Sequence, residues 1–150
     1  MTPAAPRAFK HRHVICFEET NVVGNVYFAR HVAWQGACRE MFLRAHAPGI
    51  LAEIERDLRL VTISVSCDYF QELRAFDEVD LRMSLAYERG NRIGLDFDYR
   101  VLRGDVALQC ARGRQEIGCM RAEADGALRP CPPPRELSEA LRDFRAADAR

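Results

Sequence analysis

The residues best suited to chemistry lie where an expected strand gives way to an expected helix, in the segment 18–31, EETNVVGNVYFARH. Gly24 permits a close approach of the backbone to a neighbouring group. The helix that follows points unpaired N–H groups at whatever lies beside its first turn. Such donors can stabilise the oxyanion that develops when a carbonyl carbon is attacked. On spacing alone, an ordinary polar loop is the alternative.

A long helix over residues 29–45 is expected to follow this segment, because apolar residues recur at intervals of three and four. Arg39 lies off that stripe, on a face it shares with Val32, Gly36 and Leu43. If that face is enclosed, the Arg39 guanidinium needs polar partners. We expect it to bond Asn21 or a substrate carbonyl. The alternative is a structural ion pair with a carboxylate, namely Glu18, Glu19 or Glu40.

The second half of the chain predicts an antiparallel meander. Apolar and polar residues alternate over 79–88 and again over 93–101, and the Gly90-Asn91 pair between them favours a hairpin turn. A third strand is expected over 106–120, and an earlier one over 60–70. A short strand over 13–19 and a short helix over 48–57 complete the pattern. The order predicts an α+β protein in which a five-stranded antiparallel sheet wraps around the long helix.

The composition of the chain changes after residue 123. Gly126 and a run of prolines at 130 and 132–134 lead us to divide the chain into a domain, 1–123, and a Pro-rich C-terminal tail, 124–150. A short amphipathic helix over 136–145, carrying Leu137, Leu141 and Phe144, could either dock on the domain or fray.

Charge and composition exclude several classes of function. The formal net charge is +0 and the arginines are dispersed, so no basic stripe for nucleic acid is expected. No apolar run reaches the ~20 residues that span a bilayer and no signal sequence is evident, so a cytoplasmic protein without membrane contact is expected. The six cysteines and four histidines show no metal-ligand spacing, and we expect no metal. No Gly-x-Ser-x-Gly motif, which marks the nucleophilic serine of many hydrolases, is present.

Two further residues have expected positions. Cys67 is expected to be a buried thiol, and His31 is expected to be a histidine on the helix surface or at an interface.

Thr20, Asn21, Gly24, Val26 and Tyr27, followed by Arg39 on the helix, form a recognisable series. Together with Asp68-Tyr69-Phe70 downstream, they resemble the signature of the 4-hydroxybenzoyl-CoA thioesterase branch of the hot-dog-fold proteins. Asn21 stands where much of that branch has a catalytic aspartate, and Gly36 where many relatives have a glutamate. In these departures the chain resembles the enediyne-biosynthesis thioesterase subgroup.

The resemblance implies a hot-dog fold and a thioesterase that needs no cofactor. The implied reaction releases a polyene β-ketoacyl chain from the acyl carrier protein domain of an iterative polyketide synthase, and decarboxylation then gives a methyl ketone. A homo-oligomer, a dimer of dimers, is also implied. A general acyl-CoA thioesterase and a non-catalytic acyl-binding domain are the alternatives. The implied catalytic residues are Asn21, Arg39 and Tyr27, and the implied substrate-binding residues are Gly24, Asn25, Val26, Phe28 and Trp34.

Asn21 changes what the site must do. An amide is no base at neutral pH, so the 10²–10⁴-fold that general-base catalysis typically contributes must come from elsewhere. Asn21 can still position a water through its carbonyl oxygen and its amide hydrogens. Tyr27 is expected either to donate its hydroxyl near the thioester or to pack as an aromatic with its hydroxyl at the rim.

Overall fold

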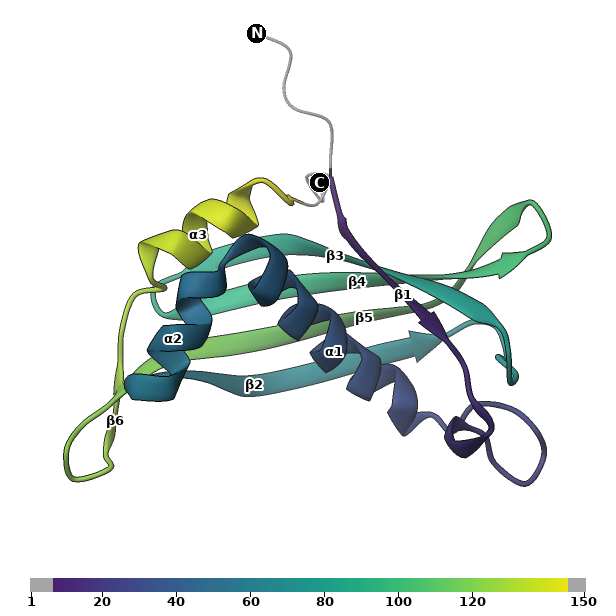
Figure 1. The fold of residues 1–150 in the computed structure, drawn as a ribbon, viewed down its shortest axis with the longest axis horizontal. Helices are drawn as coiled ribbons and strands as arrows, with labels where there is room; N and C mark the ends of the chain where they lie inside the picture. Colours follow the sequence, from purple (N-terminus) through teal and green to yellow (C-terminus); the bar gives the residue numbers. More distant parts are fainter. Residues whose placement is uncertain (1–6, 146–150) are drawn as a thin grey trace, which may run out of the picture.

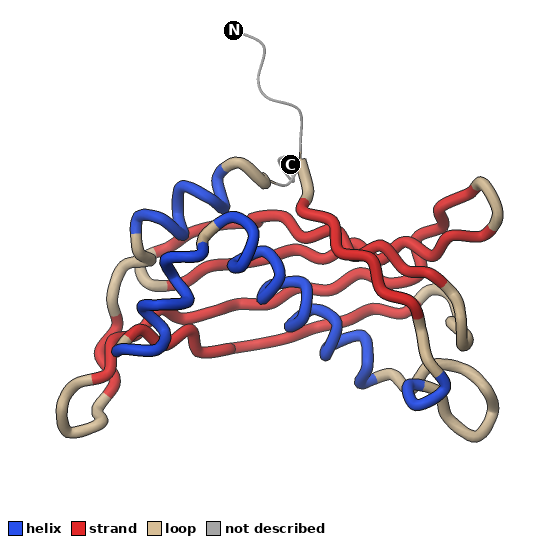
Figure 2. Tube along the Cα trace, in the orientation of Figure 1, coloured by secondary structure: helices blue, strands red, loops and turns tan. Residues whose placement is uncertain are grey.

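A computed structural model describes residues 7–145 of the chain. One antiparallel sheet curls around the long helix α1, which crosses one of its faces (Figures 1 and 2). The elements, in order, are β1 (Phe9–Val14), the 3-10 helix η1 (Phe17–Glu19), α1 (Ala29–His46), α2 (Pro48–Arg56), β2 (Leu58–Tyr69), β3 (Glu78–Arg89), β4 (Arg92–Arg103), β5 (Val106–Ala122), β6 (Leu128–Pro130) and α3 (Arg135–Arg142).

The sheet has the strand order β1-β3-β4-β5-β2, with the short β6 paired to β5, and every pairing is antiparallel. The predicted hairpin of β3 and β4 is confirmed, and so is the meander through β5. The expected five strands are present, and β6 adds a sixth that the sequence reading missed. As a result β1 and β2, the two strands that flank the helices in the sequence, form the two edges of the main sheet.

The prediction of a first strand over 13–19 was wrong. β1 pairs with β3 from Phe9 opposite Met83 to Val14 opposite Glu78, so it begins and ends earlier than expected. After Val14 the chain turns into η1, because the Glu19 carboxylate accepts a 2.8 Å hydrogen bond from the Cys16 N–H and closes a tight turn. A buried polar contact, which alternation of residue types does not encode, therefore ends the strand.

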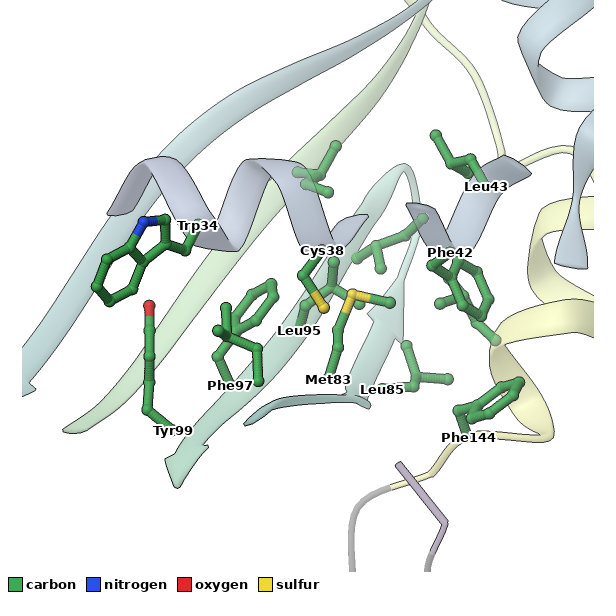
Figure 3. Packing of buried hydrophobic residues seen from close by; sticks show 14 of the residues in the cluster. Trp34, Cys38, Phe42, Leu43, Met83, Leu85, Leu95, Phe97, Tyr99 and Phe144 are labelled. Carbon is green, nitrogen blue, oxygen red and sulfur yellow. The ribbon is translucent and has the colours of Figure 1, made fainter. Parts of the chain in front are cut away.

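The core lies between α1 and the concave face of the sheet (Figure 3). Leu81, Met83, Leu95 and Phe97 project toward the helix and are buried, while the residues between them carry charge on the opposite face. On α1 the buried residues include Trp34, Cys38, Phe42 and Leu43. Two-residue periodicity in the strands and the three-to-four spacing in the helix thus meet in one apolar layer.

Gly113 on β5 lets α1 approach the sheet closely. A Cβ at this position would collide with the side-chain amide of Gln35 and would lie 2.7 Å from the carbonyl oxygen of Ser66. Gln35 uses that space to donate a 3.1 Å hydrogen bond to the Ser66 carbonyl on β2. The helix is therefore tied to the sheet near the β2 edge.

The C-terminal segment packs on the rest of the structure. The short helix expected over 136–145 is present as α3, and Leu137, Leu141 and Phe144 are buried in the same core as α1. The Phe144 carbonyl accepts a 2.6 Å hydrogen bond from the Leu85 N–H on β3. The helix is thus docked, whereas the division of the chain into units 1–123 and 124–150 stays a prediction.

No helix within residues 7–145 is both long enough and apolar enough to cross a membrane.

Candidate active site

The predicted corner exists as a compact loop between η1 and α1. Thr20 and Val26 form an isolated antiparallel bridge, and the Asn21 N–H donates to the Asn25 carbonyl at 2.8 Å. The loop reverses direction at Gly24, whose φ of +88° is a conformation that residues with a Cβ rarely adopt. The sequence led us to expect that Gly24 permits a close approach of the backbone, but a Cβ at Gly24 would meet nothing within 4 Å, so the glycine is required by the positive φ of the turn.

Asn21 organises the loop with its side chain as well as its backbone. Its Oδ1 accepts a 3.0 Å hydrogen bond from the Val23 N–H, and its carbonyl accepts one from the Gly24 N–H at 3.0 Å. Asn21 is exposed in the single chain. One subunit therefore does not enclose Asn21.

The first turn of α1 opens beside this loop. Phe28 precedes the helix, and no side chain caps it. The first N–H groups of any α-helix lack intrahelical partners, and the partial positive charge of the helix end adds to theirs. The Arg30 N–H donates to the Tyr27 carbonyl at 2.9 Å, and the other N–H groups of this turn could stabilise an oxyanion beside the loop.

A hollow of about 230 Å³ lies next to the corner and brings together several of the predicted substrate-binding residues. Asn25, Val26 and Phe28 line it on the loop side, and His31 and Tyr69 line it on the other. The Tyr69 hydroxyl donates a 2.8 Å hydrogen bond to the Phe28 carbonyl, which joins β2 to the start of α1. The hollow is therefore part of the same site as the uncapped helix end.

Tyr27 and Phe28 are both exposed, and their rings lie 4.6 Å apart at 47°. The Tyr27 N–H donates to the Glu19 carbonyl at 2.9 Å, so its backbone belongs to the corner. With its side chain at the surface, Tyr27 can donate its hydroxyl near the thioester or pack as an aromatic with its hydroxyl at the rim, the two roles expected from the sequence.

The expectation for His31 was wrong. His31 is 4% exposed and packs against the rings of Trp34, Tyr69 and Tyr99. Burial lowers the pKa of His31 to about 4, against a smaller opposing effect of the Phe28 backbone. Among the described residues, neither ring nitrogen of His31 has a hydrogen-bond partner. The imidazole is neutral over the physiological range and lies at the wall of the hollow.

Trp34 lies in the core, behind the corner. It is 4% exposed, and its indole N–H donates a 2.7 Å hydrogen bond to Glu19 Oε1. Direct contact with a ligand, expected from the resemblance, would need that packing to open. In this structure Trp34 supports the corner from inside.

Glu19 is the functional residue that the sequence reading missed, apart from naming it as a possible partner of Arg39. Its carboxylate is 5% exposed and accepts hydrogen bonds from the Trp34 indole, the Cys16 N–H and the His13 ring at 2.7–2.9 Å. Burial would raise the pKa of Glu19, but these donors outweigh it and the pKa is lowered. The acid thus joins β1, η1 and α1 behind the site. The sequence could have indicated Glu19, because it is an acidic residue next to small polar residues at the end of a strand.

Arg39 does not meet Asn21 within one subunit, which corrects the expected pairing. It lies ten residues into α1, roughly 15 Å from the first helical residue at 1.5 Å per residue. Its guanidinium donates to Gln115 Oε1 at 3.0 Å and to Thr62 Oγ1 at 3.4 Å. No carboxylate of residues 7–145 forms a salt bridge with Arg39, so the alternative ion pair is not observed either.

The surroundings of Arg39 leave its charge poorly compensated. Burial lowers the pKa of Arg39, and the only opposing contribution comes from the carboxylate of Glu40. A partly buried guanidinium with two neutral acceptors can still donate to an anionic or carbonyl oxygen. Arg39 is therefore a second candidate element of a site, near the middle of β2 rather than at the corner.

Cys67, expected to be a buried thiol, is partly buried and packs against the core. Burial raises the pKa of the partly buried Cys67 thiol, as expected for a thiol that packs rather than reacts. No cluster of three or more potential metal ligands occurs in the part of the chain that the structure describes.

Comparison with known proteins identifies the class. Residues 15–141 match the model of the Thioesterase-like superfamily, and the chain belongs to that family. Its curled antiparallel sheet around α1 is the hot-dog fold, so the predicted fold class is confirmed. Family and neighbours together support thioesterase activity.

One solved structure is similar to this chain over nearly the whole length of both. Crystal structures of the dynemicin thioesterase, which describe induced-fit and allosteric effects upon polyene binding, share 45% sequence identity with this chain. The match covers 94% of this chain and 99% of that one with a TM-score of 0.89. The predicted resemblance to the enediyne subgroup is thus confirmed.

More distant structures share the fold. A 4-hydroxybenzoyl-CoA thioesterase mutant in complex with 4-hydroxybenzoyl-CoA is 14% identical, with coverage of 90% and 99% and a TM-score of 0.77. The 1,4-dihydroxy-2-naphthoyl-CoA thioesterase from Synechocystis is 18% identical, with coverage of 91% and 97% and a TM-score of 0.75. No curated protein sequence matches the chain.

Proposed function

We propose that this protein hydrolyses the thioester that joins a polyene β-ketoacyl chain to the carrier protein domain of an iterative, enediyne-type polyketide synthase. The uncapped first turn of α1 beside the Asn21 loop is the observation that carries the reaction type. The polyene substrate class is supported by the similarity to the dynemicin thioesterase. Location in the cytoplasm remains the expectation from the sequence.

In the proposed reaction a water oxygen adds to the thioester carbonyl while the α1 N–H groups stabilise the oxyanion. The C–S bond then breaks, and the sulfur leaves as the carrier's thiol with a proton from the water. The product is a β-keto acid. The C–C bond to the carboxyl group can then break with loss of carbon dioxide. Its electron pair forms a C=C bond, the ketone oxygen takes the carboxyl proton, and the resulting enol tautomerises to a methyl ketone.

Asn21 positions the water in this scheme and does not deprotonate it. One lone pair of its Oδ1 is engaged by the Val23 N–H, so the second lone pair and the amide hydrogens are available to a water. Because the loop geometry is fixed, Asn21 contributes by orienting the water toward the thioester carbonyl. A thioester is reactive enough to be attacked by this water without a strong base.

A second copy of the chain is proposed to complete the site. β2 is an edge strand of 12 residues, and Ile63 and Val65 on it are 41% and 38% exposed, which is the kind of edge that proteins cover. Antiparallel pairing of two β2 strands about a two-fold axis would extend the sheet across both subunits. The end of β2 next to the corner in one subunit would then lie beside the opposite end of β2 in its partner. This arrangement brings the partner's corner toward Arg39. We propose a dimer with such composite sites, and a homotetramer formed from two dimers.

The direct test uses the synthase loaded with its polyene chain, the purified protein, and mass analysis of the released product. Wild-type protein is expected to release the methyl ketone. Arg39→Ala and Asn21→Ala are each expected to lower kcat/KM about 100-fold, as typical for loss of a group that stabilises or orients the transition state. Arg44→Ala, an exposed arginine on the same helix, is the matched control and should change kcat/KM less than about twofold.

Release by the wild type at the rate of buffer alone would end the proposal. Faster turnover of soluble acyl-CoA substrates than of the loaded synthase would favour a general acyl-CoA thioesterase. Tight thioester binding without hydrolysis would favour a non-catalytic acyl-binding domain.

Mixing the two inactive variants tests the composite site. In a dimer of Asn21→Ala with Arg39→Ala subunits, one site would have both residues intact and the other would lack both. With random reassociation, half of the dimers are mixed, so activity should recover to about one quarter of wild type in a two-site dimer. No recovery after subunit exchange would mean that both residues act from the same subunit.

A further inference from the structure

A narrow apolar slot lies inside the core, between α1 and the sheet. Its free volume is about 10 Å³, at or below the ~10–15 Å³ that a single water needs, so it is a dry and nearly closed space. Apart from Arg39, every side chain that lines it is apolar. Phe42, Leu43, Met83 and Leu95, which lie on its walls, are labelled in Figure 3.

The slot crosses the strands from the candidate site to the C-terminal helix. At one end it is lined by Arg39 and by Leu60 on β2, and at the other by Met83 on β3 with Leu137 and Leu141 on α3. From β2 through β5 and β4 to β3 there are three strand spacings, roughly 14 Å at ~4.8 Å each. The only polar side chain thus lies at the end near the proposed reaction, and apolar residues form the rest.

We propose that this slot binds the apolar part of the acyl chain, and that Leu137 and Leu141 form its end wall and determine the accepted chain length. The inference rests on the proposed function, since it places the thioester near Arg39. A conjugated chain is flat, and a slot between a helix layer and a sheet layer encloses both of its faces. Removing both faces of the chain from water gives the largest gain in binding free energy per unit length of chain.

α3 is the wall that can move at the lowest cost. Its side chains are tied to the rest of the chain by a 3.0 Å hydrogen bond from the Gly49 N–H to Glu136 and a 4.0 Å ion pair between Arg142 and Glu88, and just after the helix the Leu85 N–H donates to the Phe144 carbonyl at 2.6 Å. The sheet strands, in contrast, are joined by long hydrogen-bond ladders, each interrupted by a single register shift. A small outward shift of α3 replaces leucine–core contacts by leucine–acyl contacts, and the buried apolar surface is largely retained.

A second apolar space competes for the chain. An open groove of about 610 Å³ also begins at Arg39 but runs along the outside, past Leu51 on α2 and Leu128 at β6. A chain in this groove would keep one face in water, and because the groove is open, no wall would select its length. The slot and the groove therefore predict different effects of substitutions at Leu141 and Leu128.

The first experiment measures binding of trans-parinaric acid, a conjugated tetraene fatty acid whose fluorescence rises in an apolar site. Wild-type protein is expected to bind it, and Leu141→Phe, which fills the slot, should weaken binding at least tenfold. Leu128→Phe, the same change in the groove, should alter the Kd less than about twofold. The opposite order of effects, or equal effects, would overturn the proposal.

Chain-length selectivity gives a second measurement on the same wall. Leu141→Ala enlarges the slot and is expected to shift the preferred acyl length in hydrolysis upward by two or more carbons, while Leu128→Ala leaves it unchanged. An unchanged length profile in Leu141→Ala would contradict the end-wall role.

Wild-type protein provides a check that does not depend on the folding of variants. A fatty acid carrying a diazirine at its apolar end should, on irradiation, label the peptide that contains Leu137 and Leu141. Labelling confined to the segments of Leu51 and Leu128 would overturn the proposal. Parinaric acid binding requires no hydrolysis, so absence of thioesterase activity with slot binding intact would refute only the proposed function.

Discussion

Glu19 is the residue on which the geometry of the corner depends most, and its removal can be predicted quantitatively. In Glu19→Ala three hydrogen bonds to a buried carboxylate are lost, those from Trp34, Cys16 and His13. A hydrogen bond to a charged group contributes about 1.5–3 kcal/mol, and an orphaned buried donor such as the Trp34 N–H costs ~1–3 kcal/mol. The cost of burying the acid itself, which the variant no longer incurs, offsets part of this sum.

The expected loss of unfolding free energy is therefore about 3–5 kcal/mol, a large share of the 5–15 kcal/mol typical of a domain. Urea unfolding followed by circular dichroism measures it. Glu18→Ala, the exposed neighbour, is the matched control and should change stability by less than ~0.5 kcal/mol. Glu19→Gln keeps one acceptor oxygen and should fall between the two. A loss below about 1 kcal/mol in Glu19→Ala would refute the assignment of Glu19 as the support of the corner.

Two further predictions concern the surroundings of the site. The pKa of His31 is lowered to about 4 from an ordinary value of 6.5, so the unfolded chain takes up a proton that the folded chain excludes as the pH falls from 6.5 to 4. Stability should fall by up to ~3 kcal/mol over this window, and His31→Phe should flatten the slope measured by urea unfolding at each pH; an equal slope in both proteins would contradict the burial of a neutral imidazole. Gly113→Ala should destabilise by about 1–3 kcal/mol because the new Cβ meets Gln35, whereas Gly36→Ala on α1, with open space around it, should be neutral or stabilising in the same thermal or urea measurement.

Much of the fold was predictable because its elements are long and periodic. β3 and β4 alternate apolar and polar residues over most of their length, and the Gly90-Asn91 turn joins them as a hairpin. α1 was located correctly to within one residue at its C-terminal end. The errors fall where a local pattern is short, at β1 and at β6. There the deciding interactions are the hydrogen bond from the Cys16 N–H to the Glu19 carboxylate and the pairing of β6 with β5, and the alternation of apolar and polar residues indicates neither of them.

The candidate site was predictable in its first half only. Residues 21–28 are contiguous, so the sequence could indicate the glycine turn and the helix start that follows it. Arg39 was correctly separated from the main apolar stripe, but its partners Gln115 and Thr62 come from two strands far away in the sequence. Helical periodicity predicts which face of the helix a residue occupies, but it does not predict which other part of the chain covers that face.

The amino-acid sequence by itself determined the elements, their antiparallel order and the chemistry available at the corner, because those properties depend on periodicity and on neighbouring residues. Only the tertiary structure decided that His31 lies inside, that Arg39 lies near the middle of β2 rather than beside Asn21, and that α3 forms a wall of the core. Burial and long-range contact are properties of the packed chain, since they depend on which surfaces exclude water together.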